Sequence, residues 1–250
     1  MPMRGVAKRR GFLPQVTLVF FTHAPYTCHM NQGHKFISIE GTDGSGKKTQ
    51  IDLLCKYLLG QGKHVEKIAF PNYESESSGP VKMYLGGELG GSASCLDAYQ
   101  ASALYAVDRL CTMKKVLSKL PDDSYVIFDR YVPSNMIHQA GKIKSKKERD
   151  KFLKWVDKFE YETLKLPRPD VVFFMDVAPS VSLEIVKQRT TQKTGKKIDI
   201  HERDPKHLTD AYNAAKYVAK KFKWTTVDCV KDGKFKSIEE IHDIIINHIK

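Results

Sequence analysis

The sequence lacks any run of about 18 apolar residues, so no segment of it is expected to cross a membrane as a helix. It also lacks internal repeats and low-complexity tracts. Its five cysteines are dispersed, with no CxxC pair and no spacing typical of a metal site. That distribution favours free thiols packed in a core within a reducing compartment. We therefore expect a cytoplasmic globular protein that has no membrane partner.

Acidic residues are scarce relative to basic ones, and residues 1–39 contain none. The whole chain has 41 Lys and Arg against 29 Asp and Glu, which gives a net charge of +12. Such an excess suits an anionic partner: a nucleic acid, an anionic membrane or a phosphorylated small molecule. The 28% of charged and 10% of aromatic residues are otherwise typical of a globular enzyme and exclude disordered, collagen-like and disulfide-scaffold chains.

Residues 1–33 differ in character from the rest of the chain. Basic residues between Arg4 and Arg10 precede a short apolar stretch, Val16–Phe21, in an arrangement faintly similar to a signal or transit peptide. The apolar stretch is short and the downstream thiols argue against secretion, while Met30 is an alternative start. We expect residues 1–33 to be a disordered or non-essential extension, with organellar targeting as the alternative, and residues 34–250 to form one domain.

Strand and helix signals alternate from Lys35 onward. Apolar, β-branched strand signals lie at Phe36–Ile39, His64–Phe70, Tyr125–Phe128, Asp170–Met175 and Thr225–Val227. Helical patterns lie at Thr49–Leu59, Asp97–Leu117, Lys146–Leu164, Leu208–Phe222 and Ile238–Ile249, and another starts at Leu183–Arg189. Near-continuous apolar strands separated by helices indicate a three-layer α/β/α fold with a central parallel sheet. The functional site should lie at the carboxyl ends of the strands.

A glycine-rich loop directly follows the first strand signal and opens a helix. Its residues are Gly41, Thr42, Asp43, Gly44, Ser45, Gly46 and Lys47, which match the GxxxxGK phosphate loop. Glycines let the backbone curl so that successive N–H groups face a polyphosphate, and the N-terminus of the helix adds partial positive charge. The side chain of Lys47 supplies a cation to the β and γ phosphates. This motif predicts ATP binding.

One position departs from the phosphate-loop pattern. The hydroxyl residue that would normally hold Mg²⁺ is replaced by Lys48, and Thr49 follows it. A charged lysine cannot be a metal ligand. Thr49 cannot be assumed to replace the missing hydroxyl, because the next helical position points roughly 100° away around the helix. Two interpretations are open. Phosphate oxygens, water and Asp129 hold the metal without help from Lys48, or the Lys48 ammonium contributes charge to the transition state.

A second cluster follows the strand at Tyr125–Phe128. Asp129 and Arg130 at that strand tip place a carboxylate suited to Mg²⁺ beside a phosphate clamp that can bridge donor and acceptor phosphates. The plainer interpretation is an ion pair at a strand end. The basic, glycine-containing stretch Lys187–Lys197 has the composition of a lid over phosphates, or of a solvated loop. The guanine signature NKxD is absent from the sequence.

Together these motifs resemble the thymidylate kinase family over nearly all of residues 35–250. The resemblance rests on the phosphate loop, on Phe70-Pro71, on Tyr105-Ala106-Val107-Asp108-Arg109, on Asp129-Arg130-Tyr131 through Ser134, and on Pro169-Asp170 through Asp176. It implies phosphoryl transfer from ATP to dTMP, with Mg²⁺, by a homodimer that pairs through its long helices.

The resemblance also implies roles for individual residues. Asp43 would contact the sugar 3′-hydroxyl, Arg109 would read the pyrimidine base, and Arg130 would bridge the phosphates. Tyr105 would stack on the base in place of the family's phenylalanine, and it lies four residues before Arg109, on the same helix face. The further substrate contacts implied are Phe70, Ser134 and Gln139.

Two departures from the family concern positive charge. Tyr73 stands where members usually have arginine after Phe-Pro, and Gly44 stands where some carry a loop arginine. Members without that loop arginine place one in the lid, after the acid matched by Asp199, but Ile200 occupies that position here. Arg189 is our expected catalytic cation in the lid, and the other candidates are Lys193, Lys196, Lys197 and Arg203.

We therefore expect a dTMP kinase that acts mainly by positioning and charge neutralisation. Three alternatives stay open at this level: a kinase for another pyrimidine nucleotide or deoxynucleoside, a catalytically impaired nucleotide-binding protein, and a nucleic-acid binder suggested only by charge. We do not expect nucleic acid to be the partner.

Overall fold

The computed structural model describes residues 33–182 and 205–249. The predicted extension 1–33 lies outside these residues apart from Gly33, and so do the helix start at Leu183–Arg189 and the lid segment. The strands of the main sheet are β1 (Lys35–Glu40), β2 (Val65–Ala69), β3 (Tyr125–Asp129), β4 (Val171–Asp176) and β5 (Thr225–Asp228). All pair in parallel in the order β2-β3-β1-β4-β5, which confirms the predicted parallel sheet.

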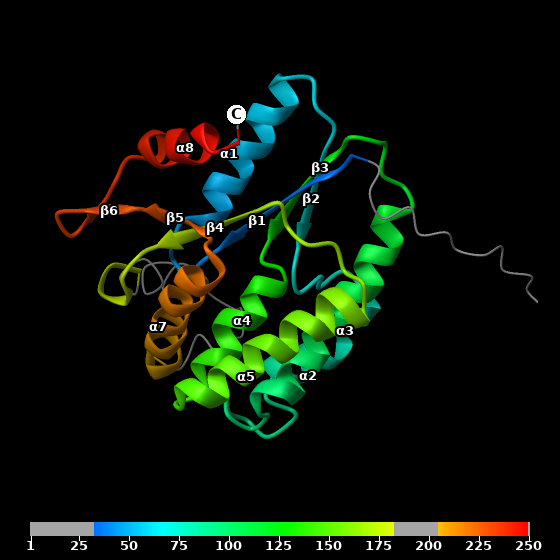
Figure 1. Cartoon of the computed structure of the whole chain (residues 1–250), viewed down its shortest axis with the longest axis vertical. Coiled ribbons are helices and arrows are strands. Elements are labelled where there is room, and N and C mark those ends of the chain that lie inside the picture. Colours follow the sequence, from blue (N-terminus) through cyan, green and yellow to red (C-terminus); the bar gives the residue numbers. More distant parts are fainter. Residues whose placement is uncertain (1–32, 183–204, 250) are drawn as a thin grey trace, which may run out of the picture.

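Helices cover both faces of this sheet, as Figure 1 shows. They are α1 (Lys47–Gly60), α2 (Gly79–Leu85), α3 (Ala98–Leu117), α4 (Val132–Gly141), α5 (Lys146–Asp157), α7 (Pro205–Phe222) and α8 (Ile238–Asn247). Short turns η1 (Glu76–Ser78) and η2 (Lys158–Thr163) and a hairpin of β6 (Val230–Lys231) and β7 (Lys234–Phe235) complete the described elements. None of the helices in residues 33–182 and 205–249 is long and apolar enough to span a bilayer.

Alternate residues along the strands contribute to two hydrophobic cores, one on each face of the sheet. Ile37 and Ile39 of β1 face α1 and α8, whereas Phe36 packs with Phe128 toward the layer of α3, α4 and α5. Because successive strand residues point to opposite faces, a strand with apolar residues at both is buried on both sides. The sheet is therefore packed on both faces, and its carboxyl ends present the loops after β1 and β3.

Several predicted helices have capping residues where the sequence places them. Asp97 caps α3 by accepting from the backbone N–H groups of Tyr99 and Gln100, and Ser237 caps α8 in the same manner through Glu240. Such capping boxes satisfy N–H groups that have no partner inside the helix. The long α3 is thereby fixed at the start of the segment that carries Tyr105 and Arg109.

Some elements differ from the sequence-based expectation. The helix expected over Lys146–Leu164 is α-helical only to Asp157 and continues as the π-helical turn η2. The helices α2 and α4 and the β6–β7 hairpin were not anticipated. α4 packs closely on α7: a Cβ added at Gly141 would lie 3.1 Å from the backbone N of Ala211, so glycine permits this approach.

Candidate active site

The loop between β1 and α1 forms an anion cradle. Gly41, Gly44 and Gly46 have φ values of 153°, 79° and 85°, in the region that favours glycine. A Cβ at Gly41 would lie 2.7 Å from Ser45 Oγ and 3.1 Å from the Met175 carbonyl oxygen, so a side chain does not fit there. Gly46 leads directly into α1, where the first-turn N–H groups have no helical partner and can bind phosphate.

The side chain of Lys47 is buried and folds back onto the phosphate loop. Its Nζ donates hydrogen bonds to the carbonyl oxygens of Gly41 (2.9 Å) and Thr42 (2.8 Å). Burial and the nearby charge of Arg130 lower the pKa of Lys47 to about 8, against the opposing effect of surrounding carboxylates. The Thr42 hydroxyl is also buried and has no hydrogen-bond partner among the described residues. A bound anion would stabilise the charge of the buried Lys47 ammonium and accept a hydrogen bond from the Thr42 hydroxyl. Lys48 and Thr49, in contrast, are exposed.

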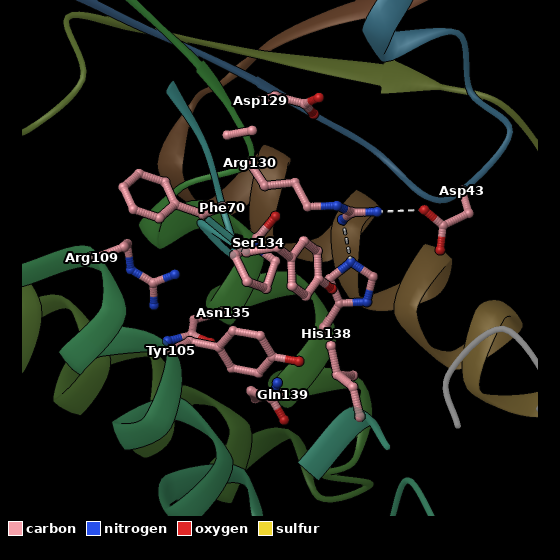
Figure 2. Close-up of a pocket in the computed structure, with 14 residues that line it drawn as sticks. Asp43, Phe70, Tyr105, Arg109, Asp129, Arg130, Ser134, Asn135, His138 and Gln139 are labelled. Atoms are coloured by element: carbon pink, nitrogen blue, oxygen red, sulfur yellow. Dashed lines mark hydrogen bonds and ion pairs between the residues drawn. The ribbon is translucent and has the colours of Figure 1, made fainter. Parts of the chain in front are cut away.

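Arg130 lies between the cradle and the neighbouring pocket. Its Nη2 donates to Asp43 Oδ1 (2.5 Å) and its Nη1 donates to His138 Nε2 (2.8 Å), as the dashed lines in Figure 2 show. Although burial opposes it, the charges of Arg130 and Lys47 hold the pKa of Asp43 well below its usual value. The structure thus brings together Asp43 from the loop after β1 and Arg130 from the loop after β3.

The backbone at Arg130 is held in an unusual conformation by a buried carboxylate. Arg130 has φ 66°, a left-handed conformation that costs about 1–2 kcal/mol for a residue with a Cβ. Glu40, fully buried at the end of β1, accepts hydrogen bonds from Tyr131 N (2.8 Å), Ser134 Oγ (2.6 Å) and Ser38 Oγ (2.9 Å). Burial raises the pKa of Glu40 despite these bonds. Glu40 therefore links the first strand to the turn that presents Arg130.

A pocket of about 320 Å³ opens beside this turn. Tyr105 and Arg109 of α3 both line it, as their spacing of four residues predicts. Figure 2 shows the two side chains on one side of the cavity, with Arg130 and Asp43 at the other. The full lining comprises Asp43, Ala69, Phe70, Pro71, Tyr73, Leu85, Tyr105, Arg109, Asp129, Arg130, Ser134, Asn135, His138 and Gln139. The expected substrate residues therefore surround one cavity.

Arg109 is fixed by an ion pair that the sequence-based reasoning missed. Its Nε and Nη2 donate to Glu160 Oε2 (2.6 Å) and Oε1 (2.8 Å), and the two side chains are only 2% and 0% exposed. Asn135 Nδ2 donates to the same Glu160 Oε1 (2.7 Å). Burial opposes the charge on Arg109, but Glu160 raises its pKa overall. The third guanidinium nitrogen of Arg109, Nη1, takes no part in this ion pair.

The remaining expected substrate residues have different roles in the packing. Gln139 is 1% exposed, lines the pocket and has an Oε1 with no hydrogen-bond partner among the described residues. A buried acceptor without a donor is costly, so a ligand N–H would stabilise it. Phe70 is 4% exposed and packs on Phe128 and Tyr131, so little of its surface is open to the pocket that it lines. The Ser134 hydroxyl donates to Glu40, so it supports the turn.

Asp129 is the carboxylate best placed for a metal. Within the described residues its side chain makes no hydrogen bond or ion pair, and in Figure 2 its carboxylate lies apart from the Arg130 guanidinium. Asp176, at the end of β4, is already engaged by Tyr212 Oη (2.9 Å) and Lys216 Nζ (3.2 Å). Because Mg²⁺ in phosphoryl-transfer sites takes one or two carboxylates with phosphates and water, the residues present fit such an ion. The described residues contain no cluster of three metal-ligating side chains.

Four functional residues were not anticipated: Glu40, Asn135, His138 and Glu160. Glu40 carried a signal, since a carboxylate that ends a buried apolar strand needs partners. His138 lies one helical turn after Ser134, on a helix that was not expected. Glu160 is 51 residues from Arg109 and had no local signal. The expected catalytic residue Arg189 lies outside the described residues.

Comparison with known proteins gives a consistent assignment. The family model described as thymidylate kinase matches residues 39–243. The chain is 32% identical to the thymidylate kinase of Mycobacterium tuberculosis (strain CDC 1551 / Oshkosh) over 169 residues, which cover 67% of this chain and 78% of the relative. It is 27% identical to the thymidylate kinase of Plasmodium falciparum (isolate 3D7) over 86% of this chain and 89% of the relative. It is 29% identical to that of Caldicellulosiruptor saccharolyticus over 86% and 98% respectively.

Proposed function

This chain belongs to the thymidylate kinase family, and from that premise we propose how its residues transfer the γ-phosphoryl group of ATP to dTMP. The observation that carries the proposal is the position of Arg130. Its guanidinium contacts Asp43 of the phosphate loop and also lines the cavity that contains Tyr105 and Arg109. One cation is therefore shared between the donor site and the acceptor site.

The acceptor nucleotide occupies the cavity of about 320 Å³. Tyr105 stacks on the thymine ring, while Arg109 donates to a base carbonyl with its orientation set by Glu160. Gln139 Oε1, which has no partner among the described residues, accepts the N3–H of thymine. Asp43 accepts the sugar 3′-hydroxyl. A pocket built on buried polar groups rejects mismatched bases because those groups would be left unpaired.

Charge neutralisation accounts for the chemical step. The N–H groups of the phosphate loop and Lys47 hold the β and γ phosphates, and Arg130 meets the oxygens that gain charge as the phosphoryl group moves. When bound, Mg²⁺ supplies further positive charge to the donor phosphates, and Asp129 is the residue that would hold it. Lys48 adds a cation near the site, and Arg189 is the proposed cation from the segment outside the described residues.

The long α3 also offers a surface for a second copy of the chain. Ala103, Val107 and Leu110 recur at helical spacing and are not fully buried, and Val107 is 48% exposed. We therefore include a homodimer through α3 in the proposal. Val107→Glu should shift the sedimentation of the protein from dimer to monomer. Lys63→Glu, at an exposed position after α1 on the opposite face of the sheet, should not.

Turnover of ATP with a panel of monophosphates tests the acceptor. The wild type should use dTMP far better than dAMP and dGMP, with ADP and dTDP as products. Equal use of purine monophosphates would contradict the assignment of Tyr105, Arg109 and Gln139 to the base. Preference for dUMP or dCMP would reassign the acceptor, and no turnover with any monophosphate would identify a nucleotide-binding protein without kinase activity.

A further inference from the structure

The hydrogen bond between Arg130 and His138 identifies the protonation state of the histidine. Arg130 Nη1 lies 2.8 Å from His138 Nε2. A guanidinium has five N–H donors and no acceptor, so His138 Nε2 must provide the lone pair. The ring is then neutral, with its proton on Nδ1. A protonated ring would place an N–H against an N–H and a cation against a cation.

Two acceptors hold the guanidinium without exhausting its donors. Asp43 accepts from Nη2 and His138 accepts from Nη1, on different sides of the guanidinium in Figure 2. These contacts use two of the five donors, so three remain for phosphate oxygens. The position of the arginine is thus set before it meets a phosphate, and its charge is still available there.

We propose that His138 is a positioning residue that presents Arg130 to the phosphates, and that it does so only while its own ring is neutral. This inference rests on the proposed function, in which Arg130 bridges donor and acceptor phosphates. When the ring is protonated at lower pH, Nε2 can no longer accept and the hydrogen bond to Nη1 is lost. Arg130 is then held by Asp43 alone, and the rate of transfer decreases.

Other charged groups around His138 belong to several elements. The phosphate loop contributes Asp43 and Lys47, the strand ends contribute Glu40 and Asp129, and α3 contributes Tyr105. On α7, which packs along α4, Lys206 and Asp210 pair with each other at 3.2 Å. Anions and cations therefore both face this region, and Arg130 is a direct hydrogen-bond partner of the ring. The acceptor phosphate of dTMP titrates in the same pH range, near 6, so a control for it is required.

The test compares His138→Gln with His138→Phe. Gln places an uncharged oxygen acceptor near the position of Nε2 and does not titrate, whereas Phe has no acceptor. At pH 7.5, His138→Phe should lower kcat/KM for dTMP by tenfold or more, and His138→Gln should restore it to within about threefold of the wild type. His138→Gln should also shift the acid limb of the kcat/KM profile to the value set by dTMP alone. His248→Gln, at the residue that follows α8, is the matched control and should keep the wild-type profile.

A double-mutant cycle shows whether the effect passes through Arg130. In an Arg130→Ala background, His138→Phe should change kcat/KM by less than twofold. The proposal is overturned if His138→Gln keeps the wild-type acid limb, if it is as impaired as His138→Phe, or if His138→Phe acts equally in both backgrounds. Circular dichroism of each variant separates these results from misfolding.

A measurement without turnover separates this inference from the assignment of the reaction. In the ¹⁵N spectrum of the protein without nucleotide, the resonances lost in His138→Gln should show the neutral tautomer protonated on Nδ1 at pH 7.5. A charged ring, or a proton on Nε2, overturns the inference even in an active kinase. A protein that shows the expected tautomer but does not phosphorylate dTMP would instead contradict the proposed function.

Discussion

Glu160→Gln is the substitution whose consequence follows most directly from the geometry. Glu160 Oε1 accepts from both Arg109 Nη2 and Asn135 Nδ2, and Oε2 accepts from Arg109 Nε. All three contacts require acceptors. A glutamine amide has one oxygen and one NH₂ group, so in either orientation the NH₂ meets at least one donor. The change also leaves the charge of Arg109 without its partner in a site that is 2% exposed.

Glu160→Gln should lower the stability of the protein strongly because both side chains of the ion pair are buried. Breaking a buried ion pair from one side costs about 3–5 kcal/mol, since the surviving charge stays buried and uncompensated. In a domain of this size, 1 kcal/mol shifts Tm by about 2–4 °C, so Tm should fall by roughly 10 °C. Glu162→Gln is the matched control: it lies in the same turn η2 but is exposed, and its effect should stay within about 0.5 kcal/mol.

Urea and thermal unfolding followed by circular dichroism measure both variants. Because the same contacts orient Arg109, KM for dTMP should rise in Glu160→Gln by tenfold or more at a temperature where the variant is folded, while KM for ATP stays within twofold. A Tm within 2 °C of the wild type would refute the reasoning. It would show that the Arg109 charge is solvated or paired in another way, and that η2 is not needed to hold it.

Three further results are expected. ATP should bind more weakly as pH rises above about 8, since a neutral Lys47 must take up a proton on binding. Lys47→Arg should remove this pH dependence. Calorimetry above pH 8 that detects no proton uptake when ATP binds the wild type would contradict the prediction. Arg109→Lys keeps the charge opposite Glu160 but loses the two-pronged contact, so KM for dTMP should rise tenfold or more; an unchanged KM would argue against base recognition by this side chain. Lys48→Ser should lower kcat by tenfold or more, about 1.4 kcal/mol of barrier, across a Mg²⁺ titration; an unchanged kcat with a lower Mg²⁺ requirement would identify Lys48 as a passive replacement.

Local sequence determined the central strands and the phosphate loop. β3 and β4 are short, almost wholly apolar runs, and β1 has the apolar residues Phe36, Ile37 and Ile39; such segments are typical of strands covered on both faces. The loop after β1 was predictable to the residue because its conformation depends on glycines and on the helix that follows. The acids Asp129 and Asp176 were recognisable as strand ends for the same local reason.

Two elements were missed for different reasons. The helix α4 has its polar residues Ser134, Asn135, His138 and Gln139 on one face, but that face lines the pocket, and the helix is only ten residues long. The β6–β7 hairpin did carry a signal in Asp232-Gly233, whose φ values of 52° and 74° suit a tight turn, but its strands are too short to show alternation.

The sequence by itself determined which chemical groups the site contains: the loop that binds phosphate, the arginine after β3, and an aromatic residue and an arginine one turn apart on α3. Only the tertiary structure decided which of these groups touch. Glu160 meets Arg109 across 51 residues, and His138 meets Arg130 from a short helix that the sequence analysis did not anticipate. The physical reason is that periodicity and turn chemistry report the conformation of neighbouring residues. The partner of a buried charge is instead set by how separate elements pack, and that packing depends on the whole fold.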